Sequence, residues 1–385
     1  MIELKNLSCT SIVSYISPVI IMKKQIYVDY LRVIATFAVI VWHCTSNIYY
    51  QFGPIEEWMP ASITFGPLVR WSVPVFIMIS GALLLGKEED PMTFYKKRFT
   101  RILIPAAIWI LIYGSIKYLH FILPYPSVPN IFKKVILESF GLFFTNQLSY
   151  HFYFVSLILG LYLLCPFISR MVRGLSKSQL ELFLLIGITL LSVRVFYQNL
   201  FLVDNFQLGG NLIFFVLGYY LHTYPPTPKF RWTLYISAIV LAILSVWLTY
   251  RKEYVGMAHD DTFYKTHGIF VFVFSSAVYV LIHQLFSTGI EEKPDGKFRK
   301  LILFISSNSY GFFLAHPLII NILLFSKSRF YTLTTSNFTL HLGGKDIGFT
   351  MNNQVGAYFL ATLVFFILCI CFYVARKIKL TKYLT

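Results

Sequence analysis

Residues 28–48 read VDYLRVIATFAVIVWHCTSNI, an apolar run long enough to cross a lipid bilayer as a single helix. About 20 apolar residues in a helix span the roughly 30 Å of hydrocarbon in a membrane. Runs of similar character follow it along the chain, at 66–86, 102–122, 151–170, 179–197, 208–223, 231–250, 266–287, 301–325 and 355–376. The sequence therefore predicts an all-α, polytopic membrane protein with about ten transmembrane helices.

The composition excludes an ordinary soluble domain. Hydrophobic residues make up 57% of the 385 positions and charged residues only 13%, whereas soluble domains carry roughly 25% charged residues. The net charge is +16, which in a soluble protein would suggest nucleic acid. Here the basic residues lie mostly in short loops between apolar runs, so we expect membrane lipid around the protein and no nucleic-acid partner.

The distribution of Lys and Arg predicts how the chain is oriented. With ten spans, the loops on the side of both termini hold 21 of these residues and the loops on the other side hold 8. The positive-inside rule then places both termini in the cytoplasm. We divide the chain into an N-terminal cytoplasmic extension (1–25), a membrane domain (26–376) and a basic cytoplasmic tail (377–385). The two longest outer loops, 123–150 and 326–354, suit lids and plain connectors equally well.

Ionisable residues within the first span form the most informative pattern. Arg32 and His43 are eleven residues apart, which puts them on one stripe of a helix about 16 Å apart along its axis. Asp29 precedes Arg32 by three residues and can pair with it. Because charged groups inside a bilayer normally face a protein or water-filled interior, this stripe predicts a functional site.

Other spans place nitrogen-bearing side chains at the same outward depth as His43. Five such groups facing lipid would be costly, so we expect a shared polar cavity that opens outward. For each residue taken alone, an interfacial or helix-packing role is an equally good interpretation. The members besides His43 are His316, His151, Arg70 and Arg194.

A second basic element precedes the third span. Arg98 and Arg101 are three residues apart and share a face if the helix has already begun, so their guanidinium groups can grip a phosphate. An ordinary positive-inside anchor is the alternative. The sequence contains no Walker loop, no dinucleotide-binding glycine pattern and no metal-ligand cluster, so we expect no metal, and a phosphate-bearing ligand would be held by side-chain cations.

Several of these segments resemble the acyltransferase-3 family of integral membrane acyltransferases, in particular its branch that acetylates surface glycans. YVDYLRVIA (27–35) followed by His43 resembles the first-helix motif of the family, an arginine and a histidine separated by ten residues. Arg98 and Arg101 before Pro105 resemble its Arg-x-x-Arg element. Further similar segments are PVFIMISG (74–81), HFYF (151–154) and NSYGFFLAH (308–316).

The resemblance implies an O-acyltransferase of the bacterial inner membrane. It would move an acyl group, with acetyl favoured, from cytoplasmic acyl-CoA to a hydroxyl of an extracytoplasmic glycan or its lipid-linked precursor. The CoA phosphates would meet a basic set at the inner surface, and Arg32 would either neutralise phosphate or line the passage. That set is Arg98, Arg101 and Lys97.

His43 is then the expected general base, because an imidazole titrates near neutral pH. Transfer through an acyl-histidine intermediate is the alternative that the sequence leaves open. Ser80, Arg70 and His316 are the expected hydrogen-bond donors to the oxyanion. The remaining substrate-binding candidates are His151 and Arg194, together with Glu56 and Glu57, either of which could orient the imidazole.

Two other functions also fit the sequence. Intramembrane Arg and His residues suit a transporter of a small polar solute or acyl group, although neither two matching halves nor paired helix breaks are found. A non-catalytic subunit of a polysaccharide export system is the third. The acceptor, the acyl chain length and the oligomeric state are left open by the sequence.

Overall fold

The computed structural model describes residues 26–46, 68–122, 131–196, 207–256, 261–287, 296–325, 331–333, 337–342, 345–350 and 353–385. Helices dominate it, starting with an N-terminal helix, Ile26–Ser46. The others are α3 (Ser72–Leu84), α4 (Pro91–Ile122), α5 (Ile131–Phe144), α6 (Tyr153–Gly174), α7 (Lys177–Phe196), α9 (Gln207–Thr223), α10 (Pro228–Gly256), α11 (Ile269–Ser287), α12 (Lys297–Ser307), α13 (Ser309–Phe325), α14 (Asn353–Lys377) and α15 (Thr381–Leu384). Short 3₁₀ turns occupy Tyr150–Phe152 (η1) and Thr262–Tyr264 (η2).

The predicted all-α, polytopic membrane class is confirmed. Nine of the ten predicted apolar runs each coincide with one helix, and the run 301–325 is divided between α12 and α13. In the described part of the chain, six helices are long and apolar enough to cross a membrane, or seven if α12 and α13, bent by 73°, form one broken span. α3 is apolar but shorter. The total of ten crossings and the side of the termini stay predictions.

The two long loops that are predicted to lie outside contain structure that the sequence patterns did not predict. The first holds α5 and η1. The second holds a three-stranded antiparallel sheet in the order β1-β2-β3, formed by Tyr331–Leu333, Asn337–Leu342 and Lys345–Thr350. Leu340 of β2 pairs with Tyr331 on one side and with Ile347 on the other. These strands of three and six residues are much shorter than the apolar runs from which the sequence predicts membrane spans.

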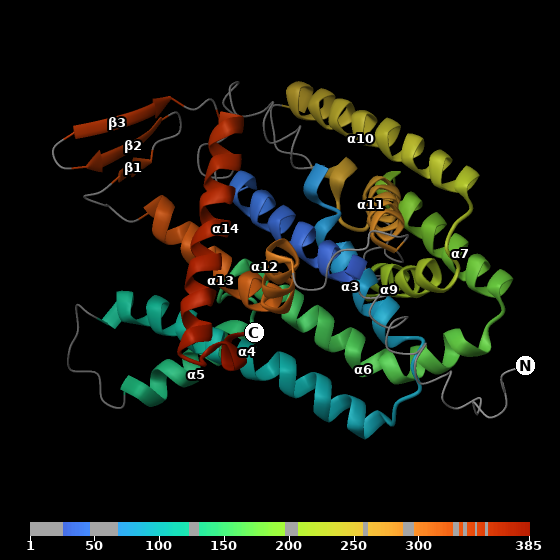
Figure 1. The fold of residues 1–385 in the computed structure, drawn as a ribbon, viewed down its shortest axis with the longest axis horizontal. Helices are drawn as coiled ribbons and strands as arrows, with labels where there is room; N and C mark the ends of the chain where they lie inside the picture. Colours follow the sequence, from blue (N-terminus) through green and yellow to red (C-terminus); the bar gives the residue numbers. More distant parts are fainter. Residues whose placement is uncertain are drawn as a thin grey trace, which may run out of the picture.

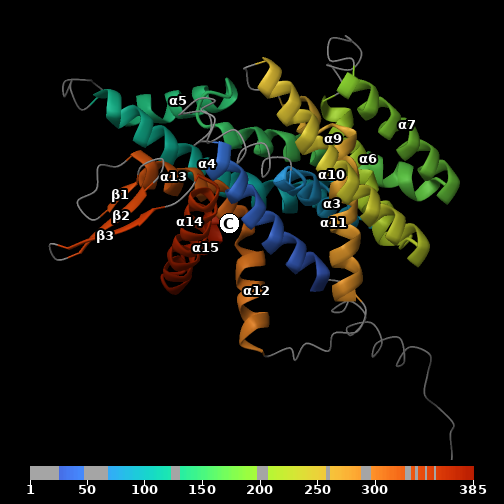
Figure 2. The ribbon, with the colours of Figure 1, turned by 90° about the horizontal axis from the view of Figure 1, so that it is seen from above.

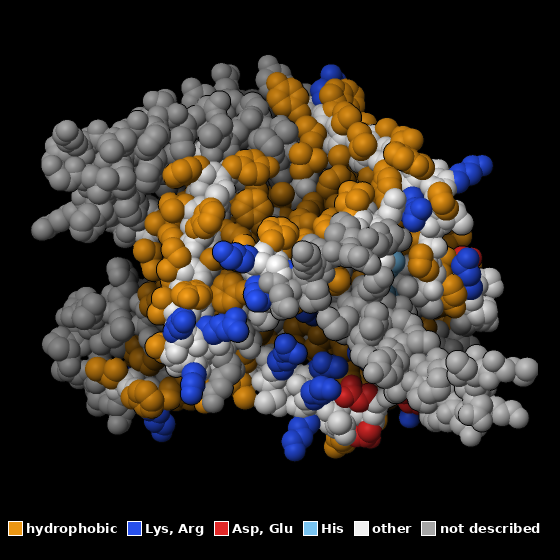
Figure 3. Space-filling view, viewed as in Figure 1, with side chains coloured by type: hydrophobic (Ala, Val, Ile, Leu, Met, Phe, Trp, Pro, Cys, Tyr) orange, Lys and Arg blue, Asp and Glu red, His pale blue; other side chains and the backbone are white. Residues whose placement is uncertain are grey.

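The N-terminal helix lies in the middle of the bundle. It runs between α14 on one side and α3 on the other in both ribbon views (Figure 1, Figure 2). Tyr27, Leu31 and Ile40 are almost completely buried there. Among the described residues in Figure 3, hydrophobic side chains predominate in the upper half, while most Lys and Arg side chains gather lower down. This helix therefore lies in the interior of the bundle.

α3 and α9 pack backbone against backbone. A Cβ atom on Gly81 would lie 1.8 Å from the Phe215 carbonyl oxygen, and one on Gly218 would lie 1.9 Å from the Met78 carbonyl oxygen. Small residues permit such close approach between helices in membranes. The packing holds α3 in place, and α3 carries several side chains of the site described next.

Candidate functional site

Two cavities lie along the N-terminal helix. The larger, of 360 Å³, is lined by four basic side chains from three segments. They are Arg32 of the N-terminal helix, Lys87 after α3, and Arg98 and Arg101 of α4. We call this cavity the arginine pocket. Within the described residues, Arg32 and Arg101 make no ion pair with a carboxylate, so both guanidinium groups are available to an anionic ligand.

The start of α4 explains why Arg98 and Arg101 act together. Pro91 begins the helix, and the Asp90 carboxylate accepts a hydrogen bond of 2.9 Å from the Thr93 backbone amide. Asp at the N-cap and Pro at the first helical position are typical helix starts. The Thr93 hydrogen bond also lowers the pKa of Asp90. Because the helix begins this early, Arg98 and Arg101 lie one turn apart, and both line the arginine pocket.

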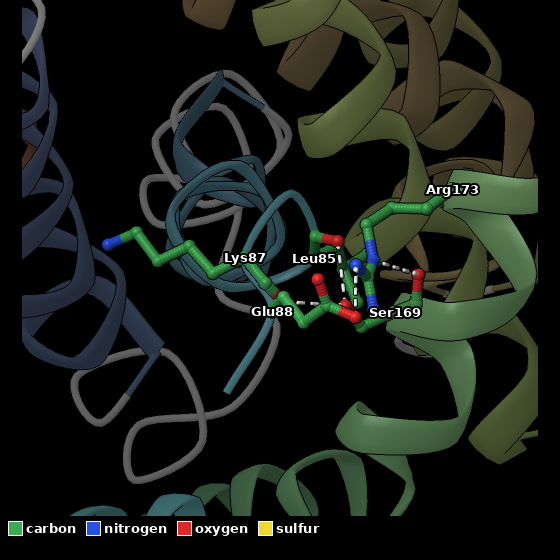
Figure 4. A network of polar contacts seen from close by, with 5 residues as sticks. All are labelled: Leu85, Lys87, Glu88, Ser169 and Arg173. Atoms are coloured by element: carbon green, nitrogen blue, oxygen red, sulfur yellow. Dashed lines mark hydrogen bonds and ion pairs between the residues drawn. The ribbon is translucent and has the colours of Figure 1, made fainter. Parts of the chain in front are cut away.

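The loop after α3 is tied to α6 (Figure 4). The Ser169 hydroxyl lies 2.8 Å and 3.1 Å from the Leu85 and Lys87 carbonyl oxygens, to which it donates. Arg173 pairs with Glu88 at 3.5 Å. The Lys87 side chain extends away from Ser169 and Arg173 in Figure 4, and it lines the arginine pocket. The anchored loop backbone thus directs the Lys87 ammonium group toward the arginine pocket.

Asp29 has a different partner from the one that the sequence predicted. Its carboxylate accepts a hydrogen bond of 2.8 Å from Arg299 and one of 2.7 Å from Ser306, both on α12, rather than pairing with Arg32. The pairing is between residues far apart in sequence, so helical spacing could not reveal it. It joins the N-terminal helix to α12 and leaves Arg32 facing the arginine pocket.

The second cavity, of 260 Å³, lies around His43. Its lining is mostly aromatic and polar and comes from the N-terminal helix, the residues just before α3, α3 itself, η1, α6 and the segment after η2: Val39, Trp42, His43, Arg70, Ser72, Val73, Tyr150, Tyr153 and Thr266. We call it the histidine pocket. The Arg70 guanidinium stacks on the Trp42 ring, 3.8 Å from the ring centroid. A cation held on an aromatic face inside the protein is well placed to meet developing negative charge.

Three histidines from distant segments meet beside this pocket. The His43 and His316 ring centroids are 5.1 Å apart, and those of His316 and His151 are 5.9 Å apart. His316 and His151 are fully buried. The sequence placed these residues at a common depth, and the fold brings them together.

Pro317 fixes the orientation of the His316 ring. Proline has no amide proton, so the carbonyl of Phe313, four residues before it, loses its helical partner. His316 Nδ1 lies 2.6 Å from that carbonyl and donates to it. In a neutral ring Nε2 is then an acceptor, and within the described chain it is buried with no hydrogen-bond partner. Neutral His316 can therefore accept a proton but cannot donate one to an oxyanion.

The Tyr113 hydroxyl repairs the next break in α13. It donates to the Leu314 carbonyl at 3.0 Å and accepts from the Leu318 amide at 2.9 Å. These two groups would bond to each other in an uninterrupted helix. The repair holds the helix around His316 in one shape.

Ser80 and Lys97 lie in places that do not suit the roles predicted for them. Ser80 lines the arginine pocket and donates to the Phe76 carbonyl at 3.1 Å, which places it away from the histidine pocket. Lys97 does not line the arginine pocket; its side chain is 62% exposed and pairs with Glu89. Lys87 takes the position that Lys97 was expected to hold. Of the three predicted oxyanion donors, Arg70 alone combines a donor group with a place in the histidine pocket.

Other predicted residues fall outside what the structure describes. They are Glu56, Glu57, the extension 1–25 and the side chain of Arg194. Sequence reasoning also missed residues that line the two pockets. Trp42 adjoins His43, and Tyr150 and Tyr153 flank the predicted His151, so proximity to a candidate was the signal available for these three. Nothing in the sequence pointed to Thr385, which follows α15 and lines the arginine pocket.

Comparison with known proteins identifies the family of the chain. A family model described as an acyltransferase domain matches residues 25–375, nearly the whole chain. The chain belongs to the acyltransferase-3 family. It is therefore a multi-pass membrane acyltransferase. Its two pockets are the candidate sites for the acyl-transfer reaction. Neither a curated protein nor a solved structure matches the chain.

Proposed function

We propose that this acyltransferase moves an acyl group, acetyl by preference, from cytoplasmic acyl-CoA to a hydroxyl of an extracytoplasmic glycan or lipid-linked saccharide. The bacterial inner membrane is the proposed location. The observation that carries the proposal is that one buried helix presents Arg32 to a basic pocket and His43 to a separate aromatic and polar pocket. A nucleotide donor and a hydroxyl acceptor need these two different environments.

The arginine pocket supports acyl-CoA as the donor. Its basic side chains suit the phosphates of CoA, since guanidinium groups bind phosphate oxygens in a bidentate way. The lining also includes the apolar side chains of Phe76, Phe154 and Ile158 and the hydroxyls of Ser80 and Tyr162. Such a mixed lining suits the pantetheine arm, which carries amides on an otherwise apolar chain.

The histidine pocket supports hydroxyl activation. His43 takes the proton of the acceptor hydroxyl, and the oxygen attacks the thioester carbonyl of the donor. Arg70 stabilises the oxyanion that forms. The new ester C–O bond then remains, the C–S bond breaks, and the proton passes from His43 to the CoA thiolate. His316 Nε2 offers His43 a nearby proton acceptor.

Acetyl transfer tests the proposal directly. The full chain in lipid nanodiscs, given acetyl-CoA labelled in its acetyl group and an extract of envelope saccharides and lipid-linked saccharides, should form a labelled product that mild alkali cleaves. Alkali lability identifies an ester. Free CoA should appear in equal amount. Uptake of a labelled polar solute into vesicles without any acyl-CoA would instead favour a transporter.

Replacing Arg98 and Arg101 together by alanine should raise KM for acetyl-CoA about a hundredfold, since hydrogen bonds to charged groups contribute about 1.5–3 kcal/mol each. The turnover number should change much less, because neither residue lines the histidine pocket. The matched control removes two exposed lysines, Lys96 and Lys177, which line neither pocket. An equal rise in KM for the control would show that the effect is one of net charge only.

A further inference from the structure

The two pockets end within one helical turn of each other on two helices. On α3, Val73 lines the histidine pocket and Phe76 lines the arginine pocket. On α6 the two boundary residues are consecutive, Tyr153 and Phe154. One turn of helix rises 5.4 Å. What separates the pockets is therefore about one layer of side chains.

On α13 the same boundary passes between Phe313 and His316. Phe313 lines the arginine pocket, and its ring centroid lies 5.7 Å from that of His316, which in turn contacts His43. Three helices from different parts of the chain thus each place a phenylalanine on the side of the arginine pocket that is nearest to the histidine pocket and His316.

The three phenylalanine rings form one continuous cluster. Phe154 lies 4.8 Å from Phe313 and 6.4 Å from Phe76, measured between ring centroids. Phe154 and Phe313 are buried, and Phe76 is half-buried. We call Phe76, Phe154 and Phe313 the phenylalanine layer. Its far side meets the histidines, since Phe313 is also 6.0 Å from His151.

We propose that the phenylalanine layer limits the length of the acyl chain, so that the enzyme accepts acetyl and rejects longer chains. The inference rests on the proposed function, in which acyl-CoA occupies the arginine pocket. A thioester held in the arginine pocket approaches His43 from the side of these three rings, so the acyl chain that it carries lies against them. The packed rings occupy the volume that additional methylenes would need, and protein interiors tolerate overpacking poorly.

A longer acyl chain cannot extend into the histidine pocket instead. The histidine pocket must hold the acceptor, and its lining by Arg70, Ser72 and Thr266 is polar at several points. An alkyl chain placed there would separate the polar side chains from water or from the acceptor, and burying polar groups without hydrogen-bond partners costs free energy. The layer is thus the surface that a longer acyl chain meets.

Binding of S-alkyl CoA thioethers tests this without any acceptor or reaction, since they lack the carbonyl. Kd is measured by calorimetry for ethyl, butyl and hexyl thioethers on the full chain in nanodiscs. The wild-type protein should bind the ethyl compound at least about tenfold more tightly than the hexyl compound, because a pocket discriminates a single methylene by roughly 10-fold or more. Phe313→Ala should reduce this ratio by about tenfold or more, through tighter binding of the hexyl compound.

A neighbouring phenylalanine is the matched control. Phe312 is fully buried on α13 against Phe365 and Phe372, and it lines neither pocket. Phe312→Ala should leave the ratio unchanged. Phe313→Leu keeps most of the packing and should give an intermediate ratio, which covers the case in which the alanine variant fails to fold.

Each outcome separates this inference from the proposed function. Equal affinity of the wild-type protein for all three compounds would overturn the role of the phenylalanine layer while leaving acyl-CoA as the donor. The same holds for a ratio that Phe313→Leu leaves untouched, or that Phe312→Ala shifts equally. Absence of binding for every CoA thioether and for CoA itself would instead reject the proposed function.

Discussion

Replacing His43 by alanine is expected to lower kcat for acetyl transfer by about a thousandfold, within the range that a general base contributes. The imidazole lines the histidine pocket, and its ring centroid is 5.1 Å from that of His316. In the proposed reaction, His43 is the residue that removes the proton from the acceptor. The measurement is formation of the alkali-labile labelled ester by the full chain in nanodiscs. Affinity for acetyl-CoA, measured in the same preparation, should change little because His43 does not line the arginine pocket.

The neighbouring residue supplies the control. Cys44 is buried on the same turn of the N-terminal helix and lines neither pocket. Cys44→Ala should keep most of the activity, so that loss in the His43 variant can be assigned to the imidazole. Normal turnover by a well-inserted His43→Ala protein would reject His43 as the base.

Replacing Gly218 by alanine is expected to prevent correct assembly of the helix bundle. The new Cβ would stand 1.9 Å from the Met78 carbonyl oxygen and 2.5 Å from its Cα, both on the α3 backbone. No rotamer change relieves a contact with backbone, so α3 and α9 must separate. Overpacking in cores costs about 1–3 kcal/mol, and a clash with backbone should reach or exceed the top of that range.

The readout is the yield of monodisperse protein after extraction in mild detergent, followed by its thermal unfolding midpoint. Gly141→Ala is the matched control, because a Cβ at that helical position meets nothing within 4 Å. It should behave as the parent protein or be slightly more stable, since alanine favours helix over glycine. Equal yields for the two variants would contradict a close backbone contact between α3 and α9.

Much of the fold followed from the order of residues. Nine of the ten apolar runs each became one helix, because hydrophobic length is a property of a contiguous segment. The run 301–325 is instead broken between α12 and α13. The Arg32 and His43 stripe was accessible for the same reason, since helical periodicity is local. The pairing of Asp29 could not be predicted in this way, because its partner Arg299 lies on a helix 270 residues further along the chain.

The site divides in the same way. Spacing alone identified Arg98, Arg101 and His43 as candidates, and depth in the membrane added His316, His151 and Arg70. The placement of Ser80 and Lys97 went against expectation, because the neighbours of a side chain depend on how its helix is rotated against others.

The amino-acid order by itself determined that this is a helical membrane protein with cations at one end of its first helix and an imidazole near the other. Only the tertiary structure decided that two pockets flank that helix, and that Phe76, Phe154 and Phe313 stand between them. The physical reason is the distance along the chain over which each kind of interaction acts. Hydropathy and helical period act over a few turns of one segment, whereas a pocket wall is assembled by packing between segments that are distant in the chain.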